Sequence, residues 1–234
     1  MNCPRVGSRI GGLLLVGVFA VAPSAYAQNM IHGTQGADQL EGTARNDRIR
    51  AQAGADQVHA RVGRDVVFGG RGDDVLHAGN GDDVIFAGRG RDLLLGQAGD
   101  DHAIGGPGDD VVVGGKGRDV LGNQVPNFGF GGDDTLRGGP GVDLLLDGTG
   151  DDVLRGGPNN KLEDSLFGGE TLSPGRGADV VFGGRGPDIV RLANDGSRDV
   201  INCGRGADTV FYNKAIDPHD VLTACEKVES HVFD

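Results

Sequence analysis

The chain has 234 residues, and 45 of them are glycine, about 19% where an average protein has roughly 7%. A collagen triple helix is excluded, because glycine does not recur at every third residue and only 9 residues are proline. With 9 Phe, 2 Tyr and no Trp, the chain lacks the bulky side chains that fill an ordinary enzyme core. The 34 acidic residues outnumber 22 basic ones, which disfavours nucleic acids and anionic membranes as partners and favours cations.

Residues 1–27 have the features of a cleaved secretory signal peptide. Arg5 and Arg9 precede an apolar run of 13 residues, and Ala25-Tyr26-Ala27 has the small-any-small form of a signal-peptidase site. The run is too short to span a bilayer, which takes about 20 apolar residues. We therefore expect a secreted, extracellular protein without membrane insertion; a buried N-terminal helix or a retained anchor is the alternative.

Removal of this segment changes the charge and the cysteine content. The net charge falls from −12 to −14, because the segment carries two arginines and no acidic residue. Cys203 and Cys225 are then the only cysteines, and an even pair in an exported protein is a candidate disulfide. Two free thiols are the alternative.

A nine-residue repeat begins after a short lead, residues 28–32. Residues 33–122 divide without gaps into ten units whose sixth position is always Asp, followed two places later by an aliphatic residue in nine units and by Ala103 in the other. Residues 123–211 continue the repeat with interruptions: residues 123–128 are inserted, one unit is stretched to carry Asp164 with Leu166, and residues 168–173 form a second insert.

The repeat predicts short strands joined by glycine turns. Glycine reaches positive φ at little steric cost, so the turn can close tightly, and three strand residues follow with the aliphatic eighth residue facing inward. Two units make one coil of eighteen residues, and stacked coils form two parallel sheets around a thin core. We therefore predict an all-β solenoid of about nine coils.

The best-formed units, Gly69-Gly-Arg-Gly-Asp-Asp-Val-Leu-His77 and Gly105-Gly-Pro-Gly-Asp-Asp-Val-Val-Val113, resemble the RTX, or haemolysin-type, calcium-binding nonapeptide repeat. The resemblance implies a parallel β-roll that binds calcium. Many members of that family are exported through an uncleaved C-terminal signal, whereas this chain carries an N-terminal one. The family's export route and toxin activity therefore do not carry over.

Stacking explains how the Asp residues can bind an ion. Residues eighteen apart lie on the same edge of adjacent coils, about 4.8 Å apart, so that pairs such as Asp74 and Asp92 can hold calcium with help from turn carbonyls. The expected metal ligands are the sixth-position aspartates Asp56, Asp65, Asp74, Asp83, Asp92, Asp101, Asp110, Asp119, Asp134, Asp143, Asp152, Asp179, Asp188 and Asp208. The turn glycines expected to help are Gly70, Gly72, Gly79, Gly81, Gly88, Gly90, Gly106, Gly108, Gly115 and Gly117.

Turn formation and surface charge are two other roles that acidic residues can have. A turn preference of Asp would not demand Asp at every sixth position. The further Asp at the fifth position of several units, such as Asp73 and Asp82, is interpreted as surface charge. The first four units lack the second-position glycine, and Arg45 replaces a fourth-position one, so calcium occupancy is expected to be weakest there.

Few other residues suggest a site. His59 and His77 are eighteen apart and would stack outside, as solvated side chains or as a transition-metal site. Phe68, Phe86 and Ile104, with Leu95 and Val113 on the opposite sheet, form outward apolar stripes, either scattered exposed residues or a surface for an extracellular or self-association partner.

The remaining segment, residues 212–234, leaves the repeat and is predicted to be a short C-terminal cap. Asp217-Pro218 with Asp220 can cap a short helix, and a solenoid needs its open end covered. A Cys203–Cys225 disulfide would link this cap covalently to the roll.

The leading function is a secreted, non-enzymatic calcium-binding β-roll with a structural or adhesive role. It is expected to fold on binding several calcium ions. No zinc helix, nucleophile elbow or phosphate loop is present, and no room is left for a separate catalytic domain. The alternative is an accessory calcium-dependent module of a secreted enzyme or effector.

Overall fold

The computed structural model describes residues 29–122, 132–146, 148–158, 171–173, 177–192, 196–212 and 215–230, with residues 171–173 described as backbone only. The regular structure in these residues is entirely β-strand. None of them forms a helix long and apolar enough to cross a membrane. The predicted signal peptide lies outside the described residues.

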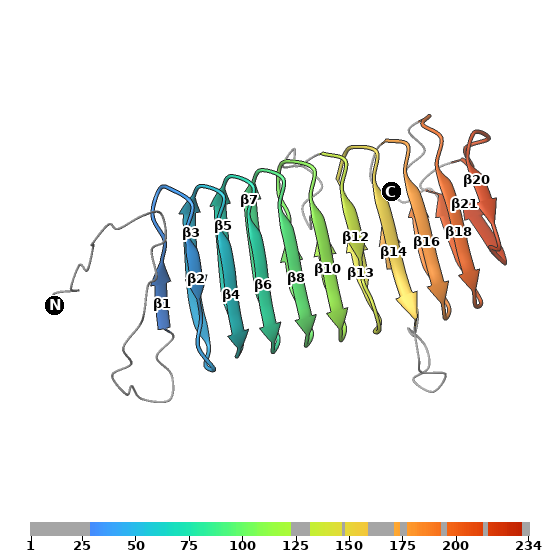
Figure 1. The fold of residues 1–234 in the computed structure, drawn as a ribbon. Coiled ribbons are helices and arrows are strands. Elements are labelled where there is room, and N and C mark those ends of the chain that lie inside the picture. Colours follow the sequence, from blue (N-terminus) through green and yellow to red (C-terminus); the bar gives the residue numbers. More distant parts are fainter. Residues whose placement is uncertain are drawn as a thin grey trace, which may run out of the picture.

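The strands form two parallel sheets that face each other along the roll (Figure 1). The chain alternates between the sheets, so each strand pairs with the strand two places away in sequence. The odd-numbered sheet contains β1 (Asn29–His32), β3 (Asp47–Ala53), β5 (Val66–Arg71), β7 (Val84–Arg89), β9 (His102–Ile104), β11 (Val120–Gly122), β13 (Leu144–Leu146), β15 (Thr171–Ser173), β17 (Ile189–Leu192), β19 (Thr209–Tyr212) and β21 (Lys227–Ser230). The even-numbered sheet contains β2 (Gln39–Glu41), β4 (Gln57–Val62), β6 (Val75–Asn80), β8 (Leu93–Ala98), β10 (Val111–Lys116), β12 (Thr135–Arg137), β14 (Val153–Pro158), β16 (Val180–Arg185), β18 (Val200–Arg205) and β20 (Val221–Thr223). The prediction of an all-β solenoid of about nine coils is confirmed.

Many strands are longer than the three residues that the repeat predicted. In the regular block β6 and β8 each contain six residues, and the pairing continues through Gly79 with Gln97 and Asn80 with Ala98. Successive turns have the same conformation, so their peptide groups stay in hydrogen-bonding register beyond the expected strand end. Each six-residue strand, such as β6 and β8, therefore includes the first three residues of the following unit.

The core is a narrow column of small and aliphatic side chains. The described eighth-position residues from Leu40 to Val210 are at most 1% exposed, and Ala103, the small exception, is fully buried. The first residue of the unit also faces inward, as the buried Ala51, Ala60 and Ala78 do. Two inward positions per unit leave room only for thin layers, which explains why the chain needs few aromatic residues.

Insertions leave the strand register intact. Neighbouring coils of the regular block are offset by eighteen residues, as in Leu76 with Leu94, whereas Val112 pairs with Leu136 and Leu154 with Val181 across longer segments. The prediction that residues 168–173 form an insert is wrong, because Leu172 in β15 pairs with Leu145. Glu170-Thr171-Leu172 has Glu where the repeat has Asp, which hid this unit; Asp164 and Leu166 lie outside the described residues.

Both ends of the roll extend the sheets. At the N-terminus Ile31 of β1 pairs with Ile49 and is buried, so the expected lead is part of the first coil. At the C-terminus β20 and β21 pair with β18 and β19. The predicted helix near Asp217 is wrong, since residues 217–220 form a turn and strand pairing continues beyond them. A last coil, rather than a helix, therefore covers the end.

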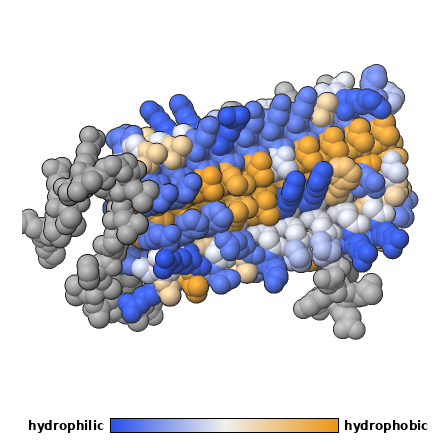
Figure 2. All heavy atoms as spheres, viewed as in Figure 1, coloured by the Kyte–Doolittle hydropathy of each residue, from blue (hydrophilic) through white to orange (hydrophobic). Residues whose placement is uncertain are grey.

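An apolar band runs along the outer face of the even-numbered sheet (Figure 2). It is formed by seventh-position residues that stand beside one another in the strand register: Val75, Leu93, Val111, Thr135, Val153, Val180, Val200 and Val221. Val111, Val200 and Val221 are exposed to solvent. On the odd-numbered sheet Phe68 and Phe86 of the predicted outward stripe stand side by side, with their rings stacked and the ring centroids 5.3 Å apart.

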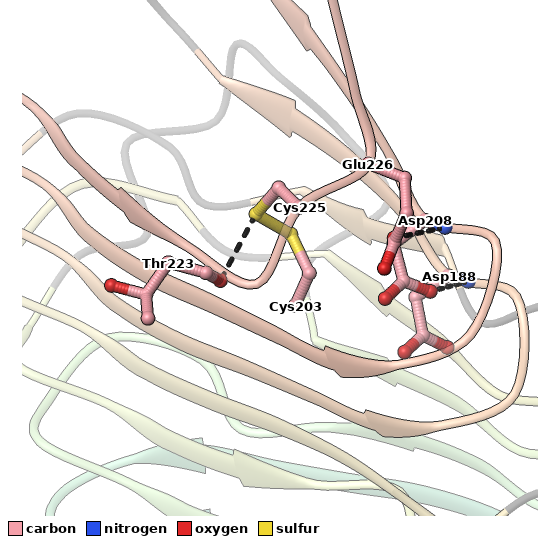
Figure 3. Close-up of a disulfide and its surroundings, with 6 residues drawn as sticks. All are labelled: Asp188, Cys203, Asp208, Thr223, Cys225 and Glu226. Carbon is pink, nitrogen blue, oxygen red and sulfur yellow. Dashed lines mark hydrogen bonds between the residues drawn. A yellow bond between two sulfur atoms is a disulfide. The ribbon is translucent and has the colours of Figure 1, made fainter.

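Cys203 and Cys225 are joined in the structure, with their Cα atoms 5.1 Å apart (Figure 3). Cys203 is fully buried at an inward first position, and Cys225 lies in the loop between β20 and β21. The Thr223 carbonyl oxygen lies 3.3 Å from Cys225 Sγ, a contact without a hydrogen bond because a disulfide sulfur carries no hydrogen. The bridge ties the last coil to the preceding one.

We predict that the exported protein carries this bridge and that its reduction loosens the C-terminal coils first. Closing a loop of 22 residues should stabilise the fold by about 3 kcal/mol on the chain-entropy model. Repeats couple mainly to their neighbours, so residues 69–122 should keep their hydrogen-exchange protection on reduction while residues 196–230 lose it. Peptide mapping without reductant checks the bond. Two alkylatable thiols in freshly secreted protein, or uniform loss of protection, would contradict the prediction.

Candidate metal centre

Sixth-position aspartates form two buried ladders, one along each edge of the roll where the chain crosses between sheets. All fourteen predicted aspartate ligands are described and are at most 6% exposed. The sheet register brings Asp74 next to Asp92, and Asp83 next to Asp101, as predicted. Burying so many carboxylates in line is unfavourable unless each is hydrogen bonded or paired with a positive charge.

One carboxylate oxygen of most described ladder residues is fixed by the neighbouring coil. The backbone N–H of Asp74 donates to Asp92 Oδ1 at 2.7 Å, and that of Asp92 donates to Asp110 Oδ1 at 2.8 Å. The pattern persists across insertions, where the N–H of Asp110 donates to Asp134 Oδ1 at 2.7 Å. These bonds hold the carboxylates in one orientation along each edge.

The second oxygen is buried without a hydrogen-bond partner at many positions. These Oδ2 atoms belong to Asp56, Asp65, Asp74, Asp83, Asp92, Asp101, Asp119, Asp143 and Asp208. Asp74 Oδ2 lies against the first residue of its own unit, where a Cβ on Gly69 would be only 2.5 Å away. The atom therefore faces into the glycine turn and away from bulk water.

The glycines of the turns have the backbone conformation that the repeat predicted. All ten predicted turn glycines have positive φ, between 115° and 141°. A Cβ on Gly81 would overlap the Gly63 carbonyl of the preceding coil, and one on Gly90 would overlap that of Gly72. Stacked turns thus bring backbone carbonyls against the next coil, next to the buried carboxylates.

These groups fit calcium better than other metals. Calcium takes six to eight oxygen ligands and accepts carboxylates and backbone carbonyls together. No group of three or more His, Cys, Asp or Glu side chains that could hold a metal occurs in the described parts of the chain. An ion bound in the ladder must therefore take much of its coordination from turn carbonyls, which suits calcium and does not suit zinc or copper.

Burial shifts the protonation of the ladder when no cation is present. It raises the pKa of Asp74, Asp83 and Asp101 to about 7, and that of Asp65 and Asp92 to about 6. The backbone N–H from the neighbouring coil opposes this shift, and nearby aspartates add to it. The desolvated negative charge is the main cost that a bound cation would offset.

The fifth-position aspartates are exposed, as predicted, but they also link the coils. Asp73 Oδ1 accepts the N–H of Arg91 at 2.9 Å, and Asp133 Oδ1 accepts that of Asp151 at 2.9 Å. Each bond goes to the following coil, opposite in direction to the bonds of the buried ladder. The sequence signal for this second ladder was its recurrence at the coil spacing.

Two ladder members at the C-terminus were missed by the sequence analysis. Asp220 Oδ1 accepts the N–H of Asp199 at 3.0 Å, and Glu226 Oε2 accepts that of Asp208 at 2.9 Å (Figure 3 shows the second). Both residues precede an aliphatic residue, Leu222 or Val228, by two places. This acid-any-aliphatic spacing was the available signal, obscured by irregular turns and by Glu in place of Asp.

The two outward histidines stack as predicted, with ring centroids 4.6 Å apart. His59 Nδ1 is 3.4 Å from Glu41 Oε1, and both side chains are about half exposed. Burial and the neighbouring His59 lower the pKa of His77. Nothing in this arrangement supplies the converging donors of a transition-metal site.

We predict that Asp92→Ala impairs calcium binding more than Asp47→Ala. Asp92 faces coils on both sides and has a bare Oδ2, whereas Asp47 Oδ2 already accepts the N–H and hydroxyl of Thr43 at 2.6 and 3.0 Å. Asp92→Ala should abolish the ions on both of its sides, and Asp47→Ala should leave the ion count unchanged, as measured by calorimetry. Asp92→Asn, which keeps an acceptor for the Asp74 N–H, separates loss of charge from loss of the hydrogen bond. Equal losses for the two alanine variants would refute the ranking.

Without calcium, the folded roll should become less stable as pH rises from about 4 to 7. The folded pKa of the ladder aspartates is raised above the ordinary value near 3.8, so the folded state binds more protons than the unfolded state in this window. Stability is therefore greatest at the acidic side and falls as pH passes through the folded pKa. Far-UV circular dichroism of the chelated chain at pH 5.5 and pH 8 tests this, because the residual β signal should be larger at pH 5.5, with light scattering to detect aggregation. A larger β signal at pH 8 would contradict it.

Comparison with known proteins gives one family match. The model of the RTX calcium-binding nonapeptide repeat (4 copies) matches residues 32–67, 59–94, 90–121, 128–160 and 171–190, more than half of the chain. A search of curated proteins found no match. The matched segments contain most of the buried Asp ladder and its glycine turns. The chain therefore belongs to the RTX calcium-binding nonapeptide repeat family.

Proposed function

We propose that this chain is a secreted, non-enzymatic protein whose β-roll folds on binding several calcium ions between stacked turns, and that the folded roll has a structural or adhesive role. The observation that carries the proposal is the set of nine buried Oδ2 atoms without a hydrogen-bond partner. Buried oxygens of this kind are rare in folded proteins unless an ion or water satisfies them.

Each position of the repeat has its own role in the folded roll. The aliphatic eighth positions supply the column of core side chains, while the glycines allow the turns to stack closely. The aspartates hold the coils in register through Oδ1 and direct Oδ2 into the turn. Calcium supplies the positive charge that offsets repulsion and desolvation of the carboxylates.

Export accounts for when the chain folds. Extracellular calcium modules bind at about 0.1–1 mM, far above the calcium concentrations at which cytosolic sensors work. A signal peptide at residues 1–27 would deliver a chain that is largely unfolded where calcium is scarce and folds where it is abundant. The Cys203–Cys225 bridge agrees with this route, because disulfides persist in oxidising compartments.

The surface supports a structural or adhesive role. The apolar band from Val75 to Val221 offers a long, flat face to a partner of the secreted protein or to a second copy. Together with the repetitive surface of a rigid solenoid, it favours contact with an extended partner over binding of a small substrate.

The proposal predicts a coil-to-β transition on calcium addition. Far-UV circular dichroism of the chain lacking residues 1–27, recorded in chelator and during a calcium titration, should change from a disordered spectrum to a β spectrum. Magnesium should substitute poorly, because it requires near-octahedral coordination and loses water reluctantly. A chelated sample with the full β spectrum and a cooperative melt would disprove the proposal.

A further inference from the structure

The second residue of each unit adopts one of two backbone conformations. It has positive φ in the interior turns, as at Gly70 (123°) and Gly88 (118°), and even where it is not glycine, as at Gln97 (85°). Thr34 and Thr43, the second residues of the first two units, are not among the residues with positive φ. A β-branched residue adopts positive φ only at high cost, so threonine excludes the interior conformation.

This difference changes which group contacts the carboxylate. The N–H and hydroxyl of Thr34 donate to Asp38 Oδ2 at 2.5 and 3.0 Å. Thr43 makes the same pair of bonds to Asp47 Oδ2. In an interior unit such as 96–104, whose second residue is Gln97, Asp101 Oδ2 has no hydrogen-bond partner. The first two turns therefore satisfy with protein donors the oxygen that interior turns leave bare.

Neighbouring groups reinforce the difference at the N-terminal end. The Gln52 side-chain amide donates to the Gly33 carbonyl, so a turn carbonyl of the first unit is also occupied.

A hydroxyl group plays the same part at the other end of the ladder. Tyr212 Oη donates to Asp220 Oδ2 at 2.9 Å, while Asp220 Oδ1 accepts the N–H of Asp199. Both carboxylate oxygens of Asp220 thus accept hydrogen bonds from protein donors. This is expected of an aspartate at the end of a ladder, where no further coil can help to bind an ion.

We propose that Thr34 and Thr43 close the first two turns without an ion, and that the second residue of each unit determines whether its turn takes calcium. Tyr212 ends the ladder at Asp220 in the same way. The inference rests on the proposed function, because it specifies which turns of the roll are calcium sites.

The gain-of-site test compares two variants that differ only at residue 34. Both carry Gln52→Gly, which frees the Gly33 carbonyl; one carries Thr34→Gly and the other Thr34→Val. Glycine permits the positive φ of an interior turn, whereas valine is β-branched and keeps the N–H of residue 34 on Asp38. Equilibrium dialysis with calcium should give one more ion per chain for the glycine variant. Equal ion counts would overturn the inference.

The loss-of-site test uses Gln97 in the regular block. Gln97→Thr should remove one ion, because threonine disfavours the positive φ of this turn, whereas Gln97→Asn should keep it, since asparagine tolerates positive φ. Circular dichroism at saturating calcium checks that each variant folds. If Gln97→Thr does not fold, the two variants at residue 34 still decide the question. Retention of the full ion count by a folded Gln97→Thr chain would count against the inference.

The outcome for the unaltered chain separates the two proposals. If it binds no calcium in dialysis, the proposed function fails. If it binds calcium and the variants at residues 34 and 97 leave the ion count unchanged, only the role of the second position fails.

Discussion

The repulsion between buried, parallel carboxylates is the constraint on which the rest of this structure depends. Strand pairing stacks like charges such as Asp74 and Asp92 in adjacent coils, and burial removes the water that would screen them. Hydrogen bonds from the preceding coil satisfy one oxygen only, and the glycine turn leaves the other without a hydrogen-bond partner. The fold is therefore complete only when a proton, a protein donor or a cation reaches that oxygen.

The sequence predicted the repetitive part of this arrangement well because each position has a single physical role. Asp at the sixth position, an aliphatic residue at the eighth and glycine in the turn determine the coil, the core and the edges. The prediction failed where glutamate takes the position that aspartate has elsewhere in the repeat. Glu170 precedes Leu172 by two places in a unit that was read as an insert, and Glu226 takes the place of an aspartate in the ladder. The hydrogen bond from the Arg91 N–H to Asp73, which joins two stacked turns, was missed because it depends on how coils stack, and one repeat does not reveal this.

The ends of the roll solve the same electrostatic problem without an ion. Threonine at the second position donates its own N–H and hydroxyl to the carboxylate, and Tyr212 donates its hydroxyl to Asp220 from another strand. The Cys203–Cys225 bridge adds a covalent link at the C-terminal end. Each device acts on a terminal coil, which has a neighbour on one side only and lacks half of the contacts available inside a solenoid.

The placement of β1 and β21 at opposite ends of the roll determines how the molecule would respond to tension (Figure 1). A pull on both termini loads the outermost coils first, so the roll should peel one coil at a time, each releasing about 60 Å of chain at roughly 3.5 Å per residue. Because Cys203 is bonded to Cys225, the load on the C-terminal side would bypass the segment between them. Under tension the coils would thus unfold one after another from the N-terminal end, while the disulfide protects the C-terminal coils.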